Sequence, residues 1–72
     1  MYSKLKEVRE QKGYNLKDMG RVINKSAPNY LKKENGDVKF SVNEALLISR
    51  FLKLKVETLF FENQVSVTEK GE

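Results

Sequence analysis

Helix start and stop signals recur at short intervals along this chain, and they constrain its fold more than any other feature. Gly13 and Gly36 each follow a helical pattern, at the position where helices often end in a left-handed residue. Asn15 and Ser26 are residues of the kind that cap helix N-termini. Pro28 fits a helix only in its first turn, which fixes a helix start just after Ser26. The spacing therefore predicts several short helices.

A further start signal lies at residues 41–44, where the S-x-x-E pattern of a capping box opens a helix of about twelve residues. Helical spacing predicts an inward stripe on this helix that consists of Val42, Ala45, Leu46, Ser49 and Leu52, with Ile48 beside it. Leu47 and Phe51 fall on its outer side, where they either serve a dimer or are simply exposed. A last short helix is predicted at residues 56–61, with Leu54, Leu59 and Phe60 closing the core.

The chain is thus predicted to be all-α, with five helices in one compact domain at residues 1–61. Residues 62–72 are predicted to be a short, flexible, acidic tail. Within it, residues 65–68 alternate in the manner of a short strand, but an isolated strand contributes little stability. The second and third helices, joined by a tight turn near Asn24, have helix-turn-helix spacing.

Composition narrows the possible functions. The 72 residues include no cysteine and no histidine. Disulfide scaffolds, thiol catalysis and cysteine-based zinc sites are therefore excluded, and so are the commonest metal ligand and general base. We expect a protein without cofactor, metal or enzymatic activity. The sequence has neither a signal-peptide pattern nor a membrane-spanning apolar run, which predicts a cytosolic protein that binds no membrane. Because no enzymatic activity is expected, no small-molecule substrate is expected either.

Charge is distributed unevenly along the chain. Residues 1–55 hold thirteen basic and six acidic side chains, a net charge of +7. Residues 56–72 hold one basic and four acidic side chains, a net charge of −3. A basic body suits an acidic partner such as nucleic acid or an acidic protein surface.

Six short motifs lie on the predicted helices and their ends: Leu5-x-x-Val8-Arg9, Gly13-Tyr14-Asn15, Met19-Gly20-x-x-Ile23, Glu34-Asn35-Gly36, Ala45-Leu46-x-Ile48 and Leu59-Phe60. Together they resemble the Cro/repressor-type helix-turn-helix domains that are common in temperate phages. The resemblance implies a lambda-repressor-like fold and binding of operator DNA, with the third helix in the major groove. It also implies a structural ion pair between Arg9 of the first helix and Glu34 at the end of the third.

The residues that would contact DNA depart from the family pattern. Leu16 stands where the family commonly has a phosphate-binding glutamine, and Ala27 and Pro28 stand at the first two positions of the recognition helix. None of these three side chains can read a base. Asn29 and Lys32 remain as candidates for base contacts.

These departures favour a protein-binding surface on the face that usually meets DNA. The partner-binding residues predicted for it are Leu16, Ala27, Pro28, Asn29, Tyr30, Leu31 and Lys32. Tyr30 has a competing interpretation, because the family has an apolar core residue at its position. The length and ending of the chain also resemble small modulators, or antirepressors, that are encoded beside the repressor in some temperate phages of Gram-positive bacteria. That resemblance implies a partner, the DNA-binding domain of a phage repressor, and a role in the lysis–lysogeny switch.

The alternative is a Cro-like repressor that binds operator DNA directly in its bacterial host. Its predicted DNA-binding residues are Lys25, Asn29, Lys32, Lys33 and Lys39, with the lysines mainly on phosphates. A mixed role, weak DNA binding that a partner tightens, lies between the two hypotheses.

Overall fold

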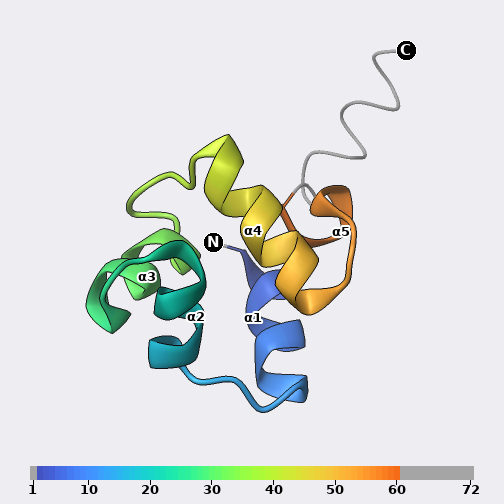
Figure 1. Cartoon of the computed structure of the whole chain (residues 1–72), viewed down its shortest axis with the longest axis horizontal. Coiled ribbons are helices and arrows are strands. Elements are labelled where there is room, and N and C mark those ends of the chain that lie inside the picture. Colours follow the sequence, from blue (N-terminus) through green and yellow to red (C-terminus); the bar gives the residue numbers. More distant parts are fainter. Residues whose placement is uncertain (1, 61–72) are drawn as a thin grey trace.

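The computed structural model describes residues 2–60, which form five α-helices joined by short loops (Figure 1). The helices are α1 (Ser3–Gln11), α2 (Leu16–Ile23), α3 (Ala27–Glu34), α4 (Val42–Leu52) and α5 (Val56–Phe60). No strand occurs in this range. The predicted all-α fold with five helices is therefore confirmed.

The boundary between α1 and α2 follows the sequence signals. Gly13 adopts a φ of +81°, a left-handed conformation that glycine reaches without strain, and it turns the chain out of α1. The Asn15 side chain accepts a hydrogen bond from the Asp18 backbone N–H at 2.8 Å. The Asp18 carboxylate in turn accepts one from the Asn15 backbone N–H at 3.0 Å. This reciprocal pair satisfies two backbone donors at the start of α2.

The starts of α3 and α4 are capped in a similar way. Ser26 Oγ accepts a hydrogen bond from the Asn29 backbone N–H at 3.3 Å, and Pro28 lies in the first turn of α3, as predicted. Ser41 Oγ accepts from the Glu44 backbone N–H at 3.1 Å, while the Glu44 carboxylate accepts from the Ser41 backbone N–H at 3.0 Å. Every capping residue predicted from the sequence is thus a cap in the structure.

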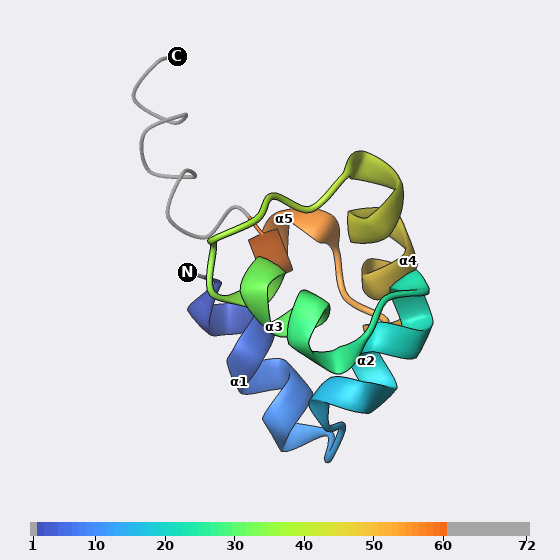
Figure 2. The ribbon, with the colours of Figure 1, turned by 90° about the vertical axis from the view of Figure 1, so that its left-hand side faces the viewer.

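The core forms where the five helices meet. α2 packs on α3 and α4, and α5 packs on α1 and α4 (Figures 1 and 2). The buried apolar side chains are Leu5, Val8, Met19, Ile23, Tyr30, Ile48, Leu52, Leu59 and Phe60. Leu59 and Phe60, which were predicted to close the core, are among them, whereas Leu54 is half-buried. A core this small leaves little margin for loss of packing.

The predicted inward stripe of α4 is partly wrong. Val42 is 78% exposed and Leu46 is 43% exposed, whereas Glu44, Ile48 and Leu52 are buried. The buried positions recur every four residues, so the inner face is centred on them, and at about 100° per residue Val42 and Leu46 point well away from that centre. Their apolar character made them look like core residues, and no local pattern indicates that Glu44 takes an inner position.

Other predicted residues of this region lie where expected. Ala45 and Ser49 are half-buried, and Ser49 Oγ donates a hydrogen bond to the Leu54 carbonyl. Leu47 and Phe51 are exposed on the outer side of α4. The end of the predicted domain at residue 61 and the predicted tail at residues 62–72 lie outside the described residues. No helix among the described residues is long and apolar enough to cross a membrane.

Candidate nucleic-acid and protein interface

A tight turn joins α2 to α3 and sets how α3 is presented (Figure 2). Asn24 adopts a left-handed conformation with a φ of +61°. The Lys25 backbone N–H then donates a hydrogen bond to the Gly20 carbonyl at 2.8 Å. A Cβ atom on Gly20 would lie 2.5 Å from the Lys25 carbonyl oxygen, which is closer than non-bonded atoms approach. Glycine at position 20 therefore lets the turn pass directly over α2.

The inner side of α3 is fixed by a buried polar network. Arg9 Nε donates to Glu34 Oε2 at 2.8 Å, and Arg9 Nη2 donates to Glu34 Oε1 at 3.2 Å. The Tyr30 hydroxyl donates to Glu34 Oε2 at 2.9 Å. Arg9 Nη1 also donates to the Tyr14 carbonyl, which ties the start of α2 to α1. The predicted ion pair between Arg9 and Glu34 is thus present and holds α3 against α1.

Two ionisable groups of this network have shifted pKa values. The hydrogen bond from Arg9 to Glu34 outweighs the effect of burial and raises the pKa of Arg9. Burial, reinforced by the nearby Glu34 carboxylate, raises the pKa of Tyr30 far above its ordinary value. Arg9 therefore stays charged and Tyr30 stays neutral at any pH at which the protein would act. The network is a structural device rather than a switch.

A second ion pair joins the end of α3 to the start of α4. Lys33 Nζ lies 3.0 Å from Glu44 Oε1 and donates a hydrogen bond to the Lys39 carbonyl at 3.0 Å. Both side chains of the pair are nearly buried, at 12% and 11% exposed. Burial opposes ionisation of Glu44, but the hydrogen bond from Ser41 and the Lys33 ammonium outweigh it and lower the pKa of Glu44.

The outer face of α3 carries most of the predicted partner-binding residues. Pro28, Asn29 and Lys32 are exposed, and Leu31 is 37% exposed. Leu16 and Ala27 are half-buried, so only part of each side chain adds to this face. We call the four exposed residues of α3, Pro28, Asn29, Leu31 and Lys32, the α3 face.

Two predicted site residues do not belong on this surface. Tyr30 has no exposed area, and its hydroxyl is bonded to Glu34, so its predicted place in the partner surface is wrong. Its spacing of four residues from Glu34 puts both on the inner side of α3. Lys33 was predicted to contact DNA, but its ammonium group is paired with Glu44. The remaining predicted lysines, Lys25, Lys32 and Lys39, are exposed.

The arrangement of α2, the tight turn and α3 is the geometry by which helix-turn-helix proteins present a recognition helix. The family described as helix-turn-helix matches residues 5–59, most of the chain. This protein belongs to the Cro/repressor-type helix-turn-helix family. No curated protein and no solved structure shows a significant match to the chain.

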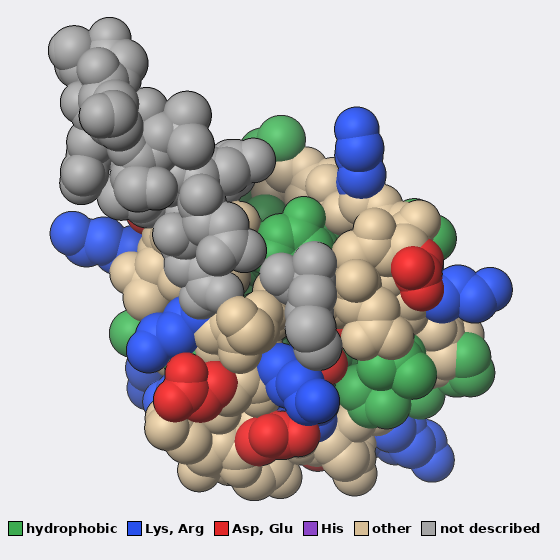
Figure 3. Space-filling model, turned by 180° about the vertical axis from the view of Figure 1, so that it is seen from behind, with side chains coloured by type: hydrophobic (Ala, Val, Ile, Leu, Met, Phe, Trp, Pro, Cys, Tyr) green, Lys and Arg blue, Asp and Glu red, His purple; other side chains and the backbone are tan. Residues whose placement is uncertain are grey.

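Members of this helix-turn-helix family are DNA-binding transcription regulators and not enzymes, and the match over residues 5–59 supports the regulatory role for this protein. On the face seen in Figure 3, most basic side chains lie toward the edge, acidic side chains lie among them, and hydrophobic side chains form patches. Sequence reasoning missed one apolar residue near the recognition helix, Val38, which is 43% exposed in the loop after α3. It also missed the pairing of Lys33 with Glu44. The spacing could have indicated that pair, because Lys33 lies three residues after the buried Tyr30, at a position that faces inward on α3.

Proposed function

We propose that this helix-turn-helix protein is a phage-type modulator of transcription whose α3 face binds the DNA-binding domain of a partner repressor. The observation that carries the proposal is the chemistry of the outer side of α3. Pro28 and Leu31 are exposed there, and Lys33 is tied to Glu44. Asn29 and Lys32 are the two predicted base-reading side chains that remain exposed.

This face suits a protein better than a base sequence. One good bidentate base contact gives about 1–3 kcal/mol of discrimination, so two readers give modest specificity. An exposed leucine and proline beside an amide and an ammonium group form the mixed apolar and polar surface that protein interfaces use. A repressor's DNA-binding domain that is held by this face would be diverted from its operator.

A binding titration tests the proposal. Leu31→Asp should weaken repressor binding by about tenfold or more, because the carboxylate would be desolvated at the centre of the interface. Leu47→Asp is the matched control, since Leu47 is exposed to a similar extent, 36%, on α4. Fluorescence anisotropy of labelled operator DNA, with the repressor and each variant, reports the outcome. Equal activity of both variants against the repressor would rule out the α3 face as the binding surface.

The second candidate is a Cro-like repressor that binds operator DNA directly, and the exposure of Asn29, Lys25, Lys32 and Lys39 favours it. In this case the protein alone should bind its operator near physiological salt. The double variant Asn29→Ala/Lys32→Ala should then lose discrimination between operator and unrelated DNA. Absence of operator binding by the protein alone near physiological salt would exclude the Cro-like hypothesis. Sequence-specific binding that the double variant retains would exclude Asn29 and Lys32 as its base-reading residues.

A further inference from the structure

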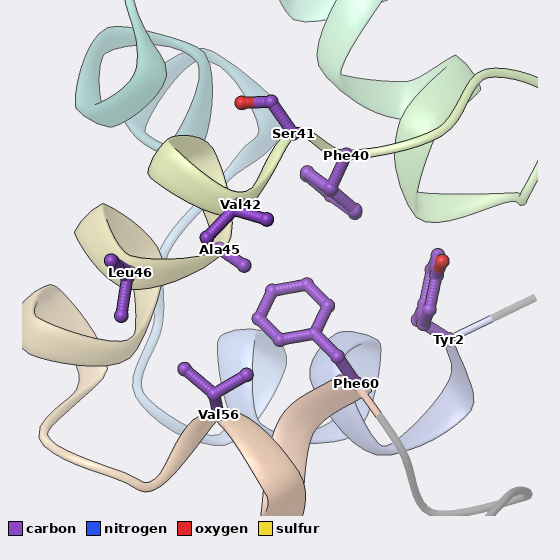
Figure 4. Close-up of a pocket in the computed structure, with 8 residues that line it drawn as sticks. All are labelled: Tyr2, Phe40, Ser41, Val42, Ala45, Leu46, Val56 and Phe60. Atoms are coloured by element: carbon purple, nitrogen blue, oxygen red, sulfur yellow. The ribbon is translucent and has the colours of Figure 1, made fainter.

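An apolar groove lies on the side of α4 that faces α5 (Figure 4). Its volume is about 280 Å³, and its apolar lining includes Phe40, Val42, Ala45, Leu46, Val56 and Phe60. The rings of Phe40 and Phe60 pack edge to face at 5.1 Å between centroids and form its floor. Val42, at 78% exposed, and Leu46, at 43%, form its outer wall. These are the two residues of the predicted inward stripe of α4 that are exposed in the structure.

The charges beside the groove are mainly basic. Lys39 precedes Phe40, Lys55 precedes Val56, and Arg50 lies one turn after Leu46; all three are exposed. Of the neighbouring acidic residues, Glu44 is already paired with Lys33. Glu57, which follows Val56, is exposed on α5. An apolar groove with this surrounding charge suits an occupant that is both apolar and acidic.

The chain itself supplies a segment of this chemistry directly after the groove-lining residue Phe60. Residues 61–67 contain the apolar side chains Phe61, Val65 and Val67, and Glu62 is their one charged residue. At residues 65–68 the apolar side chains alternate with polar ones, so an extended segment would present its valines to one side. A segment tethered beside its site has an effective concentration in the millimolar range, so even a weak contact would be occupied.

We propose that the α4–α5 groove is the docking site of the protein's own residues 61–67. Phe61, Val65 and Val67 cover Val42 and Leu46, and Glu62 lies near the basic residues around the groove. Seven extended residues reach about 23 Å, which is enough to cross from α5 to α4, because packed helices lie about 8–10 Å apart. Docking explains why a small protein keeps a valine at the most exposed apolar position of α4. The proposal is independent of what the α3 face binds.

Paramagnetic broadening in the full-length protein tests this docking. The chain has no cysteine, so Ser66→Cys creates a single attachment point for a nitroxide on the side opposite the two valines. We expect the label to remove most of the amide signal of Ala45, Leu46 and Val56 while leaving that of Lys17, on α2, intact. A spectrum in which the groove amides keep their intensity would overturn the proposal.

Matched variants and a mixed sample sharpen the result. Leu46→Asp should restore the groove signals, whereas Leu47→Asp, on the other flank of α4, should leave the broadening unchanged. Val65→Asp/Val67→Asp should restore them too, and it leaves the residues of the helical body unaltered. A mixed sample contains isotope-labelled protein that carries no nitroxide and unlabelled protein that carries the nitroxide. The isotope-labelled protein in this mixture should show no broadening. Broadening in that mixture would mean that a second copy supplies the segment, and it would overturn docking within one chain.

Discussion

The Glu34 carboxylate accepts hydrogen bonds from Arg9 and Tyr30 and is only 1% exposed. A buried ion pair adds little net stability compared with an apolar pair, but the loss of one partner leaves an uncompensated charge. We expect Arg9→Ala to lower the free energy of unfolding by about 3 kcal/mol, a large part of the stability of so small a domain. Urea denaturation measures the change, with Lys12→Ala on the exposed end of α1 as control. A loss no greater than that of the control would show that Glu34 finds other partners.

Two physical effects act in opposite directions on the stability of a Gly20→Ala variant, so the sign of the stability change shows which effect is larger. In a helix, alanine is favoured over glycine by about 1 kcal/mol, so propensity alone predicts that Gly20→Ala stabilises the protein. The Cβ atom would meet the Lys25 carbonyl oxygen at 2.5 Å, a backbone atom that cannot rotate away. We therefore expect Gly20→Ala to destabilise by about 1–3 kcal/mol, as overpacking does. Thermal unfolding followed by circular dichroism decides the sign, and a raised melting temperature would contradict the close approach of the turn.

At the scale of elements, the ion pair between Lys33 and Glu44 couples α3 to α4 and makes stability depend on pH. The folded protein holds the pKa of Glu44 below its usual value, so its ionised form stabilises the fold. That contribution is complete above the unfolded pKa of about 4.3 and is lost as the pH falls through the lower, folded pKa. Glu44→Gln should therefore be less stable than the natural chain at neutral pH, and the difference should shrink below about pH 4.

Denaturant unfolding of both proteins from neutral to acid pH measures this difference. Glu57→Gln is the control, because Glu57 is exposed on α5 and its variant should follow the natural chain throughout. A Glu44→Gln difference that stays constant across the range would mean that the carboxylate charge contributes nothing to the coupling of the two helices.

The elements were predictable because their limits are encoded locally. Asn15, Ser26 and Ser41 cap the N–H groups of their own helices, and Gly13 ends its helix by its own backbone conformation. The inner face of α4 was not predictable in this way. The inward position of Glu44 is compensated by Lys33, a residue of another helix that reaches Glu44 only in the folded protein. The same holds for the α3 face. Its exposed residues could be predicted from the sequence of α3 alone, whereas the pairing of Lys33 with Glu44, which removes Lys33 from the DNA-binding candidates, could not.

At the scale of the whole molecule, positive charge is what every hypothesis for this protein shares. Residues 1–55 carry a net charge of +7, which attracts nucleic acid and acidic protein surfaces alike. Charge alone therefore does not decide whether the α3 face binds a protein or DNA. It also does not decide which DNA sequence would be recognised. The contribution of charge to binding can be separated from that of specific contacts by varying the salt concentration, since screening weakens charge attraction far more than it weakens specific contacts.

The salt dependence of DNA binding should identify which lysines contact phosphates. Each phosphate contact adds about 0.9 to the slope of log affinity against log salt concentration. We expect Lys25→Ala, Lys32→Ala and Lys39→Ala each to reduce the slope by about 1, because these exposed lysines lie in α3 or in the loops on either side of it. Lys33→Met should leave the slope unchanged, since Glu44 already neutralises the Lys33 ammonium. Anisotropy titrations on one DNA fragment at several salt concentrations give the slopes, and Lys12→Ala serves as a control, because Lys12 is exposed at the end of α1 and not next to α3 in the chain. A reduced slope for Lys33→Met would mean that DNA draws Lys33 away from Glu44, and the coupling of α3 to α4 would then change on binding.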